Sequence, residues 1–322
     1  MNNSIVFFCG SAKHLEKRTC QELGIQPGKI DLGCFSDGEH HVQILENVRG
    51  KKVFVVGVTT PPFDNFLEMS LIVDAAKRAS AAQIIIVPAY LGYNRQDRKD
   101  KPRVPISADV VCDFLGKSAH KVVLFDLHSE VTAAFFRNST VDVLFTSWLA
   151  VPFIKEQLGE EISNLVVVSP DAGGAKRAQK YSKLLGLGGS YAMISKGERP
   201  ADNQIGNDLK VVGEVRGKDI IIVDDILDTC GTIVKAAMAL KQQGAQRVFI
   251  YAPFALLSGN ALDKLQTFHE VITQVFTTNV IYHKPQDLQG KDVKITIIPF
   301  EPFLAQVVKR MAREESLSEL FI

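Results

Sequence analysis

The sequence predicts an α/β protein of two similar halves, each a mostly parallel sheet flanked by helices. Six short apolar runs rich in β-branched residues lack polar alternation, which is typical of strands covered on both faces. Two stretches, 68–80 and 232–244, have apolar residues at helical spacing, and the second stops at Gly244, a common helix-ending residue. The six expected strands span 52–58, 84–90, 121–128, 165–171, 219–225 and 248–254.

An internal repeat accounts for the two halves. Residues 47–94 align with residues 214–260, and both copies begin Val-Arg-Gly-Lys and continue as strand, loop, helix and strand. A chain of 322 residues is also long for a single core. We therefore expect two duplicated domains and a final segment that packs back on the first; these span residues 1–145, 146–300 and 301–322.

Composition excludes several other classes of protein. A formal net charge of +1 argues against general nucleic-acid binding, and no apolar stretch reaches the length of a membrane span. The first residues show neither the basic leader nor the apolar core of a signal peptide. The five scattered cysteines form no CxxC pair, so neither a disulfide framework nor a zinc site is expected. These features favour a cytoplasmic protein.

The most informative motif is "DDILDTCGT", residues 224–232, in which acids and a glycine join an apolar strand to a helix. A strand end followed by a helix N-terminus is where α/β proteins bind anionic ligands. Carboxylates suit sugar hydroxyls or a hydrated Mg²⁺, and Gly231 between Thr229 and Thr232 suits a phosphate. The matching stretch of the first half, "GVTTPP", has no acids. We therefore expect a sugar-phosphate site in the second half alone.

This motif resembles the phosphoribosyl diphosphate signature of the type I phosphoribosyltransferase fold. Further motifs are similar to one branch of that fold, the class I ribose-phosphate pyrophosphokinases, also called phosphoribosyl diphosphate synthetases. The likeness runs from about residue 5 to residue 321. The motifs are "FSDGE" (35–39), "YNRQDRK" (93–99), "PISA" (105–108), "FDLH" (125–128), "SPDAGGAKRA" (169–178) and "ESLSELF" (315–321).

The resemblance implies a reaction between ATP and ribose 5-phosphate. The C1 hydroxyl of the sugar would attack the β-phosphorus of ATP, giving phosphoribosyl diphosphate and AMP. ATP would contact two groups of residues, the first of them from a neighbouring subunit: Phe35, Asp37 and Glu39, and then Arg95, Gln96 and Asp97. Ribose 5-phosphate would contact Arg199, Asp224, Asp225, Asp228, Thr229, Cys230, Gly231 and Thr232.

The resemblance also implies a catalytic lid and a magnesium ion. Lys196 and Arg199, in the polar loop 195–203, would clamp the phosphates as charge develops in the transition state. Relatives carry Lys-Arg-Arg or Lys-Glu-Arg where this chain reads Lys-Gly-Glu-Arg, so the register of Arg199 is open. His128 and Asp171 each end an apolar run and would hold Mg²⁺ on the ATP phosphates.

For assembly and regulation, the resemblance implies a hexamer built from dimers, with phosphate or ADP bound between subunits. The stretch "SEVTAAFF" (129–136) lacks the Asp-Gln and the later Gln that usually follow the "DLH" motif, which leaves the response to these effectors open. The residues that match the regulatory site are Arg49, Lys99, Asp100, Lys101, Arg103, Ser316, Ser318 and Phe321.

Two other functions stay open from the sequence. A phosphoribosyltransferase would share the sugar-phosphate motif, but such enzymes need one domain and no ATP motifs. A catalytically silent regulatory subunit would have lost metal ligands or the lid lysine, whereas His128, Asp171 and Lys196 are all present. The residues therefore favour an active synthetase.

Overall fold

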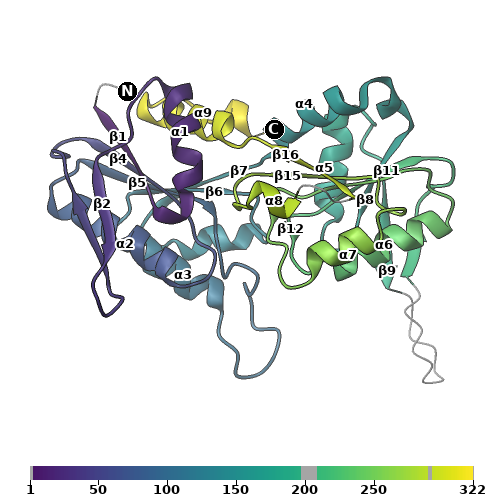
Figure 1. The fold of residues 1–322 in the computed structure, drawn as a ribbon, viewed down its shortest axis with the longest axis horizontal. Coiled ribbons are helices and arrows are strands. Elements are labelled where there is room, and N and C mark those ends of the chain that lie inside the picture. The colour runs from purple at the N-terminus through teal and green to yellow at the C-terminus, as the bar shows by residue number, and fades with distance from the viewer. Residues whose placement is uncertain (1–2, 197–208, 289–291, 322) are drawn as a thin grey trace. The chain divides into compact units, whose positions relative to one another are not determined.

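The chain forms two compact units in the computed structural model, which describes residues 3–196, 209–288 and 292–321 (Figure 1). Unit 1 combines Met1–Thr146 with Phe300–Ile322, and unit 2 is Ser147–Pro299. The sequence placed the corresponding boundaries at 145/146 and 300/301. Unit 1 is thus built from two segments that are distant in the chain.

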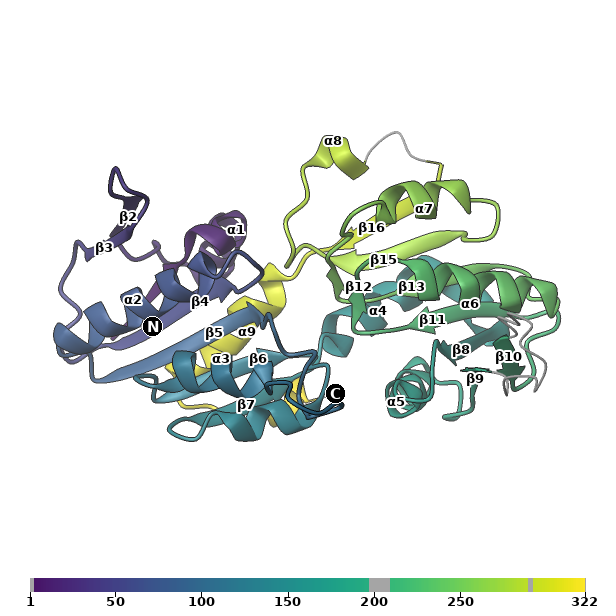
Figure 2. The same ribbon diagram turned by 90° about the horizontal axis from the view of Figure 1, so that it is seen from below.

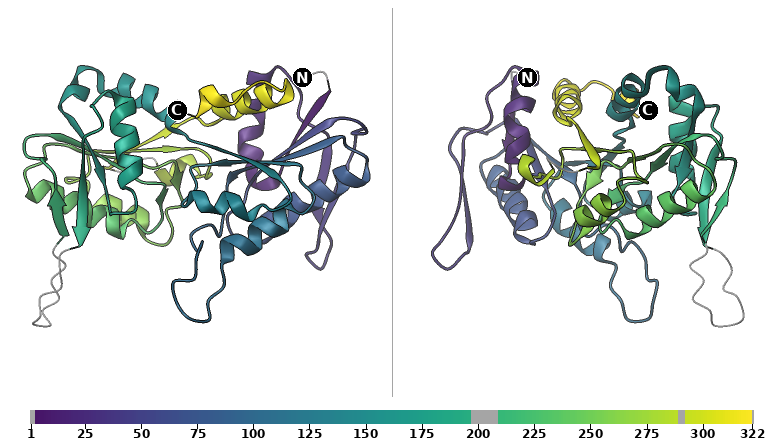
Figure 3. Two further views of the ribbon diagram at one scale, coloured as in Figure 1. Left: turned by 180° about the vertical axis from the view of Figure 1, so that it is seen from behind. Right: turned by 45° about the vertical axis from the view of Figure 1, so that its right-hand side comes forward.

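Unit 1 contains a five-stranded parallel sheet in the order β1-β4-β5-β6-β7 (Figure 2). Helices α2 and α3 cover one face, and α1 and α9 lie together on the other (Figures 1 and 3). A hairpin of β2 (Ile30–Cys34) and β3 (His40–Ile44) extends from this body. The other elements are β1 (Ser4–Phe8), β4 (Lys52–Val58), β5 (Gln83–Tyr90), β6 (Lys121–Phe125), β7 (Thr140–Leu144), α1 (Lys13–Leu23), α2 (Asp64–Arg78), α3 (Ser107–Gly116), α9 (Glu301–Ala312), and 3-10 turns at Gly10–Ala12, Glu130–Phe135 and Ser318–Leu320.

Unit 2 contains a seven-stranded sheet in the order β10-β9-β8-β11-β13-β15-β16, parallel except for the edge strand β10. A two-stranded ribbon, β12 with β14, extends past its carboxyl edge. The elements are β8 (Leu165–Ser169), β9 (Tyr191–Lys196), β10 (Leu209–Val212), β11 (Asp219–Val223), β12 (Ile226–Leu227), β13 (Val248–Tyr251), β14 (Phe254–Ala255), β15 (Gln274–Thr278), β16 (Lys294–Ile298), α4 (Ser147–Leu158), α5 (Ala175–Leu185), α6 (Gly231–Gln242), α7 (Ala261–Thr267), α8 (Pro285–Leu288) and a 3-10 turn at Gly159–Asn164.

The central strand of unit 2 is buried on both faces, as its unbroken apolar sequence predicts. Side chains alternate along a strand. Ile220 and Ile222 accordingly pack with α6 and α7, whereas Ile221 and Val223 pack with α4 and α5. All four residues are fully buried.

The two sheets share one topology, which confirms the duplicated α/β fold. Strands β8-β11-β13-β15-β16 follow the same spatial and chain order as β1-β4-β5-β6-β7, and unit 2 adds β9 and β10 at one edge. The helix expected at 232–244 is α6, with Gly244 just beyond it at a positive φ of 91°. The helix expected at 68–80 begins four residues earlier, at Asp64.

Four expected strands are shorter than the sequence suggested: 248–254 ends as a strand at Tyr251, and the other three differences matter for the site. The runs 121–128, 165–171 and 219–225 end as strands at Phe125, Ser169 and Val223. In each case the final polar residues lie in the loop beyond the sheet, where they are available for binding.

Within the described residues, the helices are all too short or too polar to cross a membrane.

Candidate functional site

Parallel pairing brings the candidate residues of unit 2 to one edge of its sheet. Strands β8, β9 and β11 are neighbours that run in the same direction, with Ser169 opposite Met193 and Val168 opposite Ile222. The loops that follow these strands therefore leave from the same carboxyl edge, the usual ligand edge of such sheets. Asp171, Lys196 and Asp224 all follow or end one of these strands.

The loop from Asp228 to Thr232 is braced so that its backbone can face a ligand. Leu257 and Ser258 donate backbone N–H groups to the carbonyls of Leu227 and Asp228, at 3.0 and 3.1 Å. Lys264 Nζ donates to the carbonyl of Thr229 at 3.0 Å. With these carbonyls turned toward the protein, the loop leads into the N-terminus of α6, where backbone N–H groups suit an anion.

Open space lies beside this loop at Gly231. A Cβ built on Gly231 meets no described atom within 4 Å, so protein packing does not require glycine there. A glycine at such a position leaves room for a ligand to approach the backbone closely. Cys230, just before it, has φ of 57° and ψ of 4°, and burial raises the pKa of its thiol to about 11. Cys230 is therefore a buried neutral thiol that shapes the turn.

The two acids that follow β11 differ in their surroundings. About 30% of the Asp224 side chain is exposed, against 6% for Asp225. Arg177 Nη1 lies 3.1 Å from Asp224 Oδ1 and 2.9 Å from Asp225 Oδ1. Burial, together with neighbouring Asp225, raises the pKa of Asp224 to about 7, while Arg177 opposes that rise. Asp224 and Asp225 are therefore adjacent acids that share one guanidinium, and their proximity opposes ionisation of Asp224.

Unit 1 has no room for an acid at the position that matches Asp224. The repeat aligns Gly57 of β4 with Asp224. A Cβ on Gly57 would come within 2.6 Å of Met69 Cε and 3.1 Å of Cys9 Sγ, both of which are fully buried. A side chain there would require the core of unit 1 to repack. The acidic half of the motif therefore has no counterpart in unit 1.

Asp171 stabilises the turn that begins α5. Its Oδ1 accepts the backbone N–H of Gly174 at 3.0 Å, and its carbonyl accepts Ser169 Oγ–H at 2.6 Å. A Cβ on Gly174 would come within 2.6 Å of Ser169 Oγ, so this position needs glycine. The turn holds an exposed carboxylate beside the end of β8.

His128, the other expected magnesium ligand, is exposed in the loop after β6 of unit 1, so the expected pair is divided between the units. In the described parts of the chain, no three His, Cys, Asp or Glu side chains gather as a metal site. Mg²⁺ prefers oxygen ligands and keeps several waters or phosphates. The exposed carboxylate of Asp171 fits an ion that arrives with its own phosphate ligands, rather than an ion enclosed by protein.

The lid residues fall at the limit of the structure. Lys196 is the last residue of β9, with its backbone paired to Leu209 of β10. Its side chain and the whole of Arg199 lie outside the described residues.

The expected ATP motif "RQD" lies at the carboxyl edge of the sheet in unit 1. Gln96 is tied to the start of α3, because its Oε1 accepts Ser107 Oγ–H at 2.7 Å and its carbonyl accepts the N–H of Ala108 at 3.1 Å. Arg95 beside it is exposed and Asp97 is half-buried. Strands β5 and β6 are neighbours, so this loop and the loop of His128 leave the sheet side by side.

Phe35, Asp37 and Glu39 form the tip of the β2–β3 hairpin. The Phe35 N–H donates to the carbonyl of Glu39 at 2.8 Å, and Asp37 Oδ1 accepts the Glu39 N–H at 3.0 Å. These bonds fix a tight turn that leaves 58% of Phe35 exposed, with its ring centroid 5.1 Å from that of His41. An exposed aromatic ring on a rigid turn can stack on a flat ligand.

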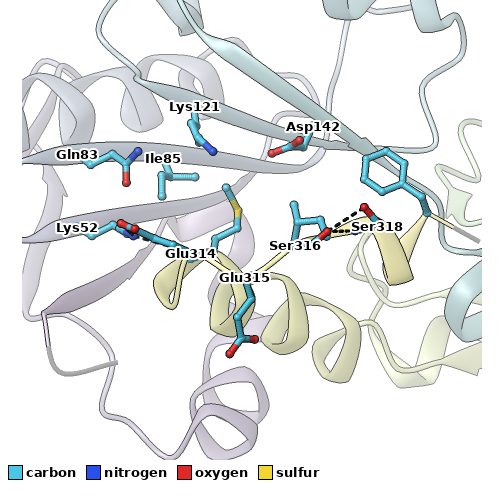
Figure 4. Close-up of a pocket in the computed structure, with 12 residues that line it drawn as sticks. Lys52, Gln83, Ile85, Lys121, Asp142, Glu314, Glu315, Ser316 and Ser318 are labelled. Carbon is cyan, nitrogen blue, oxygen red and sulfur yellow. Dashed lines mark hydrogen bonds and ion pairs between the residues drawn. The ribbon is translucent and has the colours of Figure 1, made fainter.

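Three of the eight expected regulatory residues line a cavity of about 480 Å³ in unit 1. Lys121 and Asp142, on β6 and β7, face Ser316 and Ser318 of the C-terminal segment across it (Figure 4). Phe321 also lines the cavity, as do Lys52 and Gln83, which the sequence did not single out. The remaining expected residues do not line this cavity in the described structure; they are Arg49, Lys99, Asp100, Lys101 and Arg103.

Sequence reasoning also missed Arg177, although its motif was noted. The available signal was a basic residue in the first turn of a helix, where the helix dipole disfavours it. Lys264 gave no signal, because its contact with Thr229 joins segments 35 residues apart.

Comparison with known proteins agrees with this geometry. Residues 4–118 match the family model described as the N-terminal domain of ribose phosphate pyrophosphokinase, and residues 202–322 match the phosphoribosyl synthetase-associated domain. The chain is 41% identical to the ribose-phosphate pyrophosphokinase of Shewanella oneidensis, with 98% of each chain covered. It is 38% identical to that of Porphyromonas gingivalis, with 99% of this chain and 98% of the relative covered.

A solved structure gives the same result for the fold. The crystal structure of phosphoribosylpyrophosphate synthetase from Mycobacterium smegmatis matches with a TM-score of 0.86 and 31% identity, covering 97% of this chain and 99% of the other. Together with the duplicated sheets and the acidic strand end of unit 2, these matches show that the chain belongs to the ribose-phosphate pyrophosphokinase family.

Proposed function

We propose that this chain is a ribose-phosphate diphosphokinase that transfers the β,γ-diphosphoryl group of ATP to the C1 hydroxyl of ribose 5-phosphate. The C1 oxygen forms a bond to the β-phosphorus, and the bond from that phosphorus to the α–β bridging oxygen breaks. AMP leaves, the hydroxyl proton is lost, and phosphoribosyl diphosphate is the product. The observation that carries this proposal is the acid pair Asp224–Asp225 beside the open loop 228–232 at the start of α6.

The sugar phosphate would be held at both ends. The 5-phosphate would occupy the loop of Asp228, Thr229, Cys230, Gly231 and Thr232, where N–H groups and the positive end of α6 favour an anion. Asp224 would accept hydrogen bonds from the ribose hydroxyls. This arrangement fixes the C1 hydroxyl, and fixed orientation is a large part of catalysis in transfers of this type.

ATP would be held by residues of unit 1 and by the lid. Phe35 would stack on adenine while Asp37 and Glu39 contact the base edge, and this hairpin would come from a neighbouring subunit. Arg95, Gln96 and Asp97 would contact the nucleotide. A hairpin that extends away from the body of its own unit supports the shared site.

Mg²⁺ would be held by Asp171 and His128 and would neutralise phosphate charge when bound. Lys196 and Arg199 would stabilise the charge that develops on the transferred group. Each of these residues acts by position and charge, with no covalent intermediate.

The chain would work in the cytoplasm as a hexamer built from dimers. Its five cysteines are unpaired thiols, which suits a reducing compartment. Phosphate or ADP would act at a regulatory site that includes Ser316, Ser318 and Phe321, which line one cavity of unit 1.

The direct test is AMP formation from ATP, Mg²⁺ and ribose 5-phosphate, with and without added phosphate. Replacing Lys196 with Ala should lower kcat by about 100-fold or more if its charge acts on the transition state. Lys183→Met, an exposed change on α5, is the control and should keep parent activity. Folded parent protein that forms no AMP would favour the silent-subunit function instead.

A further inference from the structure

Arg177 occupies a position that helix electrostatics disfavour. It is the third residue of α5, inside the first helical turn, where unsatisfied N–H groups make the helix end positive. No acidic residue stands in that first turn of α5. A cation placed there needs compensation from elsewhere in the fold.

The compensation comes from the acids that follow β11. Nη1 of Arg177 bridges Asp224 Oδ1 at 3.1 Å and Asp225 Oδ1 at 2.9 Å. Asp224 Oδ1 also accepts the backbone N–H of Asp225 at 2.9 Å. This oxygen is therefore held by two donors, and the orientation of the Asp224 carboxylate is fixed before any ligand arrives.

The two acids are placed for different tasks. Asp225 is buried at 6% side-chain exposure, whereas Asp224 keeps about 30% of its side chain exposed at the edge of the sheet. A ligand can reach Asp224, and a buried carboxylate such as Asp225 needs a partner cation. We propose that Arg177 is a positioning residue that joins the buried Asp225 to the accessible Asp224 and so presents the Asp224 carboxyl in a fixed orientation to the ribose hydroxyls. This inference rests on the proposed function in assigning ribose as the ligand.

Removing Arg177 would leave two adjacent acids without their shared cation. Two charged groups act on Asp224: Asp225 from the same loop, which raises the pKa of Asp224, and Arg177 from α5, which lowers it. Without the guanidinium, the pKa of Asp224 would rise further, so that a smaller fraction of this carboxyl would be ionised at neutral pH. Asp224 would then lose the charge that strengthens its hydrogen bonds with sugar hydroxyls.

The test is calorimetric titration of ribose 5-phosphate into the full chain at pH 7 and pH 8.5. Arg177→Met should weaken binding severalfold at pH 7, because loss of the guanidinium raises the pKa of Asp224 further and lowers the fraction of Asp224 that is ionised. The loss should shrink at pH 8.5, where Asp224 ionises again. Lys183→Met, which removes an exposed cation from the same helix, should bind like the parent.

Two further variants separate positioning from simple folding. Arg177→Lys keeps the charge but not the planar guanidinium, and should recover only part of the affinity. The double variant Arg177→Met with Asp225→Asn removes the repulsion and should bind more tightly than Arg177→Met alone. Circular dichroism melts check that each variant is folded.

The binding measurements and the AMP assay together distinguish a failure of the role proposed for Arg177 from a failure of the proposed function. Equal affinity in Arg177→Met and the parent, or a loss that neither pH nor Asp225→Asn relieves, would overturn the role of Arg177 while leaving the enzyme intact. A parent that binds ribose 5-phosphate but forms no AMP would overturn the proposed function alone. A parent that does not bind ribose 5-phosphate would overturn both.

Discussion

Cys230 shows how a single residue sets the shape of the phosphate loop. Its backbone is left-handed, with φ of 57°, at the residue immediately before α6. This conformation costs an L-residue about 1–2 kcal/mol and is worst for β-branched side chains. This turn leads directly into α6, which begins at Gly231 beside open space.

Substitution of Cys230 should therefore follow backbone preference rather than thiol chemistry. Cys230→Gly should keep ribose 5-phosphate affinity, because glycine adopts positive φ freely, whereas Cys230→Val should weaken it and destabilise the fold by about 1–2 kcal/mol. Titration calorimetry and thermal melts measure both effects. Cys34→Val, in the strand of the exposed hairpin, is the matched control. Equal affinity in the glycine and valine variants would contradict the role of the turn.

Asp224 should give the enzyme a pH dependence near neutrality. Its pKa is raised from 3.8 to about 7, so the carboxyl is protonated below that value and ionised above it. The ratio kcat/KM for ribose 5-phosphate should rise with pH through about 7, and Asp224→Asn should remove this limb. An unchanged pH profile in the Asp224→Asn variant would contradict the assignment.

The Asp224 carboxyl affects the stability of the fold in the opposite direction: stability falls as pH rises, whereas activity should increase. Because the folded state binds a proton that the unfolded state releases near pH 4, this contribution to stability is present below pH 4 and is lost as pH rises toward 7. The melting temperature of Asp224→Asn should therefore depend less on pH than that of the parent over this window. Melts at pH 5 and pH 7.5 measure the difference.

At the scale of elements, α9 is attached to the sheet of unit 1 by a lysine at its end. Lys52 Nζ, with 14% of its side chain exposed, donates to the carbonyls of Met311 and Ala312 at 3.1 and 3.5 Å. It also lies 3.2 Å from Glu314 Oε1. A cation at a helix C-terminus satisfies the last carbonyls and the negative end of the dipole.

Removing this contact should loosen the C-terminal segment. Lys52→Met should destabilise unit 1 by about 1–2 kcal/mol, since it leaves helix carbonyls without their charged donor. Lys29→Met changes an exposed lysine of the same unit and should have little effect. Urea unfolding measures both free energies. Equal stability of the two variants would show that Lys52 does not hold α9.

The sequence predicted the strands well and their ends less well. Apolar, β-branched runs identified six sheet strands, because burial on both faces leaves a continuous pattern: β4, β5, β6, β8, β11 and β13. Strands β1, β7, β15 and β16 of the same two sheets were not predicted. The ends were extended by two or three residues where polar side chains continue the run. The chain turns at Asp126, whose φ is 37° and whose Oδ2 accepts the Thr146 N–H at 2.7 Å. That contact joins residues 20 apart, so it leaves no local pattern.

The candidate site was predictable only in part, for a related reason. The acids and the glycine turn form one continuous motif, so Asp224 and Gly231 could be identified from spacing. Arg177 could not be assigned, because its distance from Asp225 depends on how α5 packs beside β11. The difference in burial between Asp224 and Asp225 likewise arises from three-dimensional packing.

At the scale of the whole molecule, the chain passes out of unit 1 and returns to it. Residues 300–322 complete unit 1 after unit 2 has been formed by an unbroken segment. Phe300 and Phe303 are fully buried, with ring centroids 5.0 and 5.6 Å from that of Phe125 in β6. One face of the first sheet therefore depends on the last residues of the protein.

Deleting residues 300–322 should unfold unit 1 and spare unit 2. Loss of each buried phenylalanine costs about 3–5 kcal/mol, which approaches the whole stability of a domain. Hydrogen exchange read by mass spectrometry should show β6 unprotected and β11 still protected. Full protection of β6 in the shortened chain would contradict this dependence.

The central claim is that the chain transfers two phosphoryl groups of ATP together to the sugar bound in unit 2. Phosphorus NMR of ATP, Mg²⁺ and ribose 5-phosphate with the full chain tests it most directly. We predict that the ATP signals are replaced by those of AMP and of a diphosphate attached to C1 of the ribose, with Lys196→Ala slowing the change. Formation of ADP with a singly phosphorylated C1, or no consumption of ATP by folded protein, would contradict it.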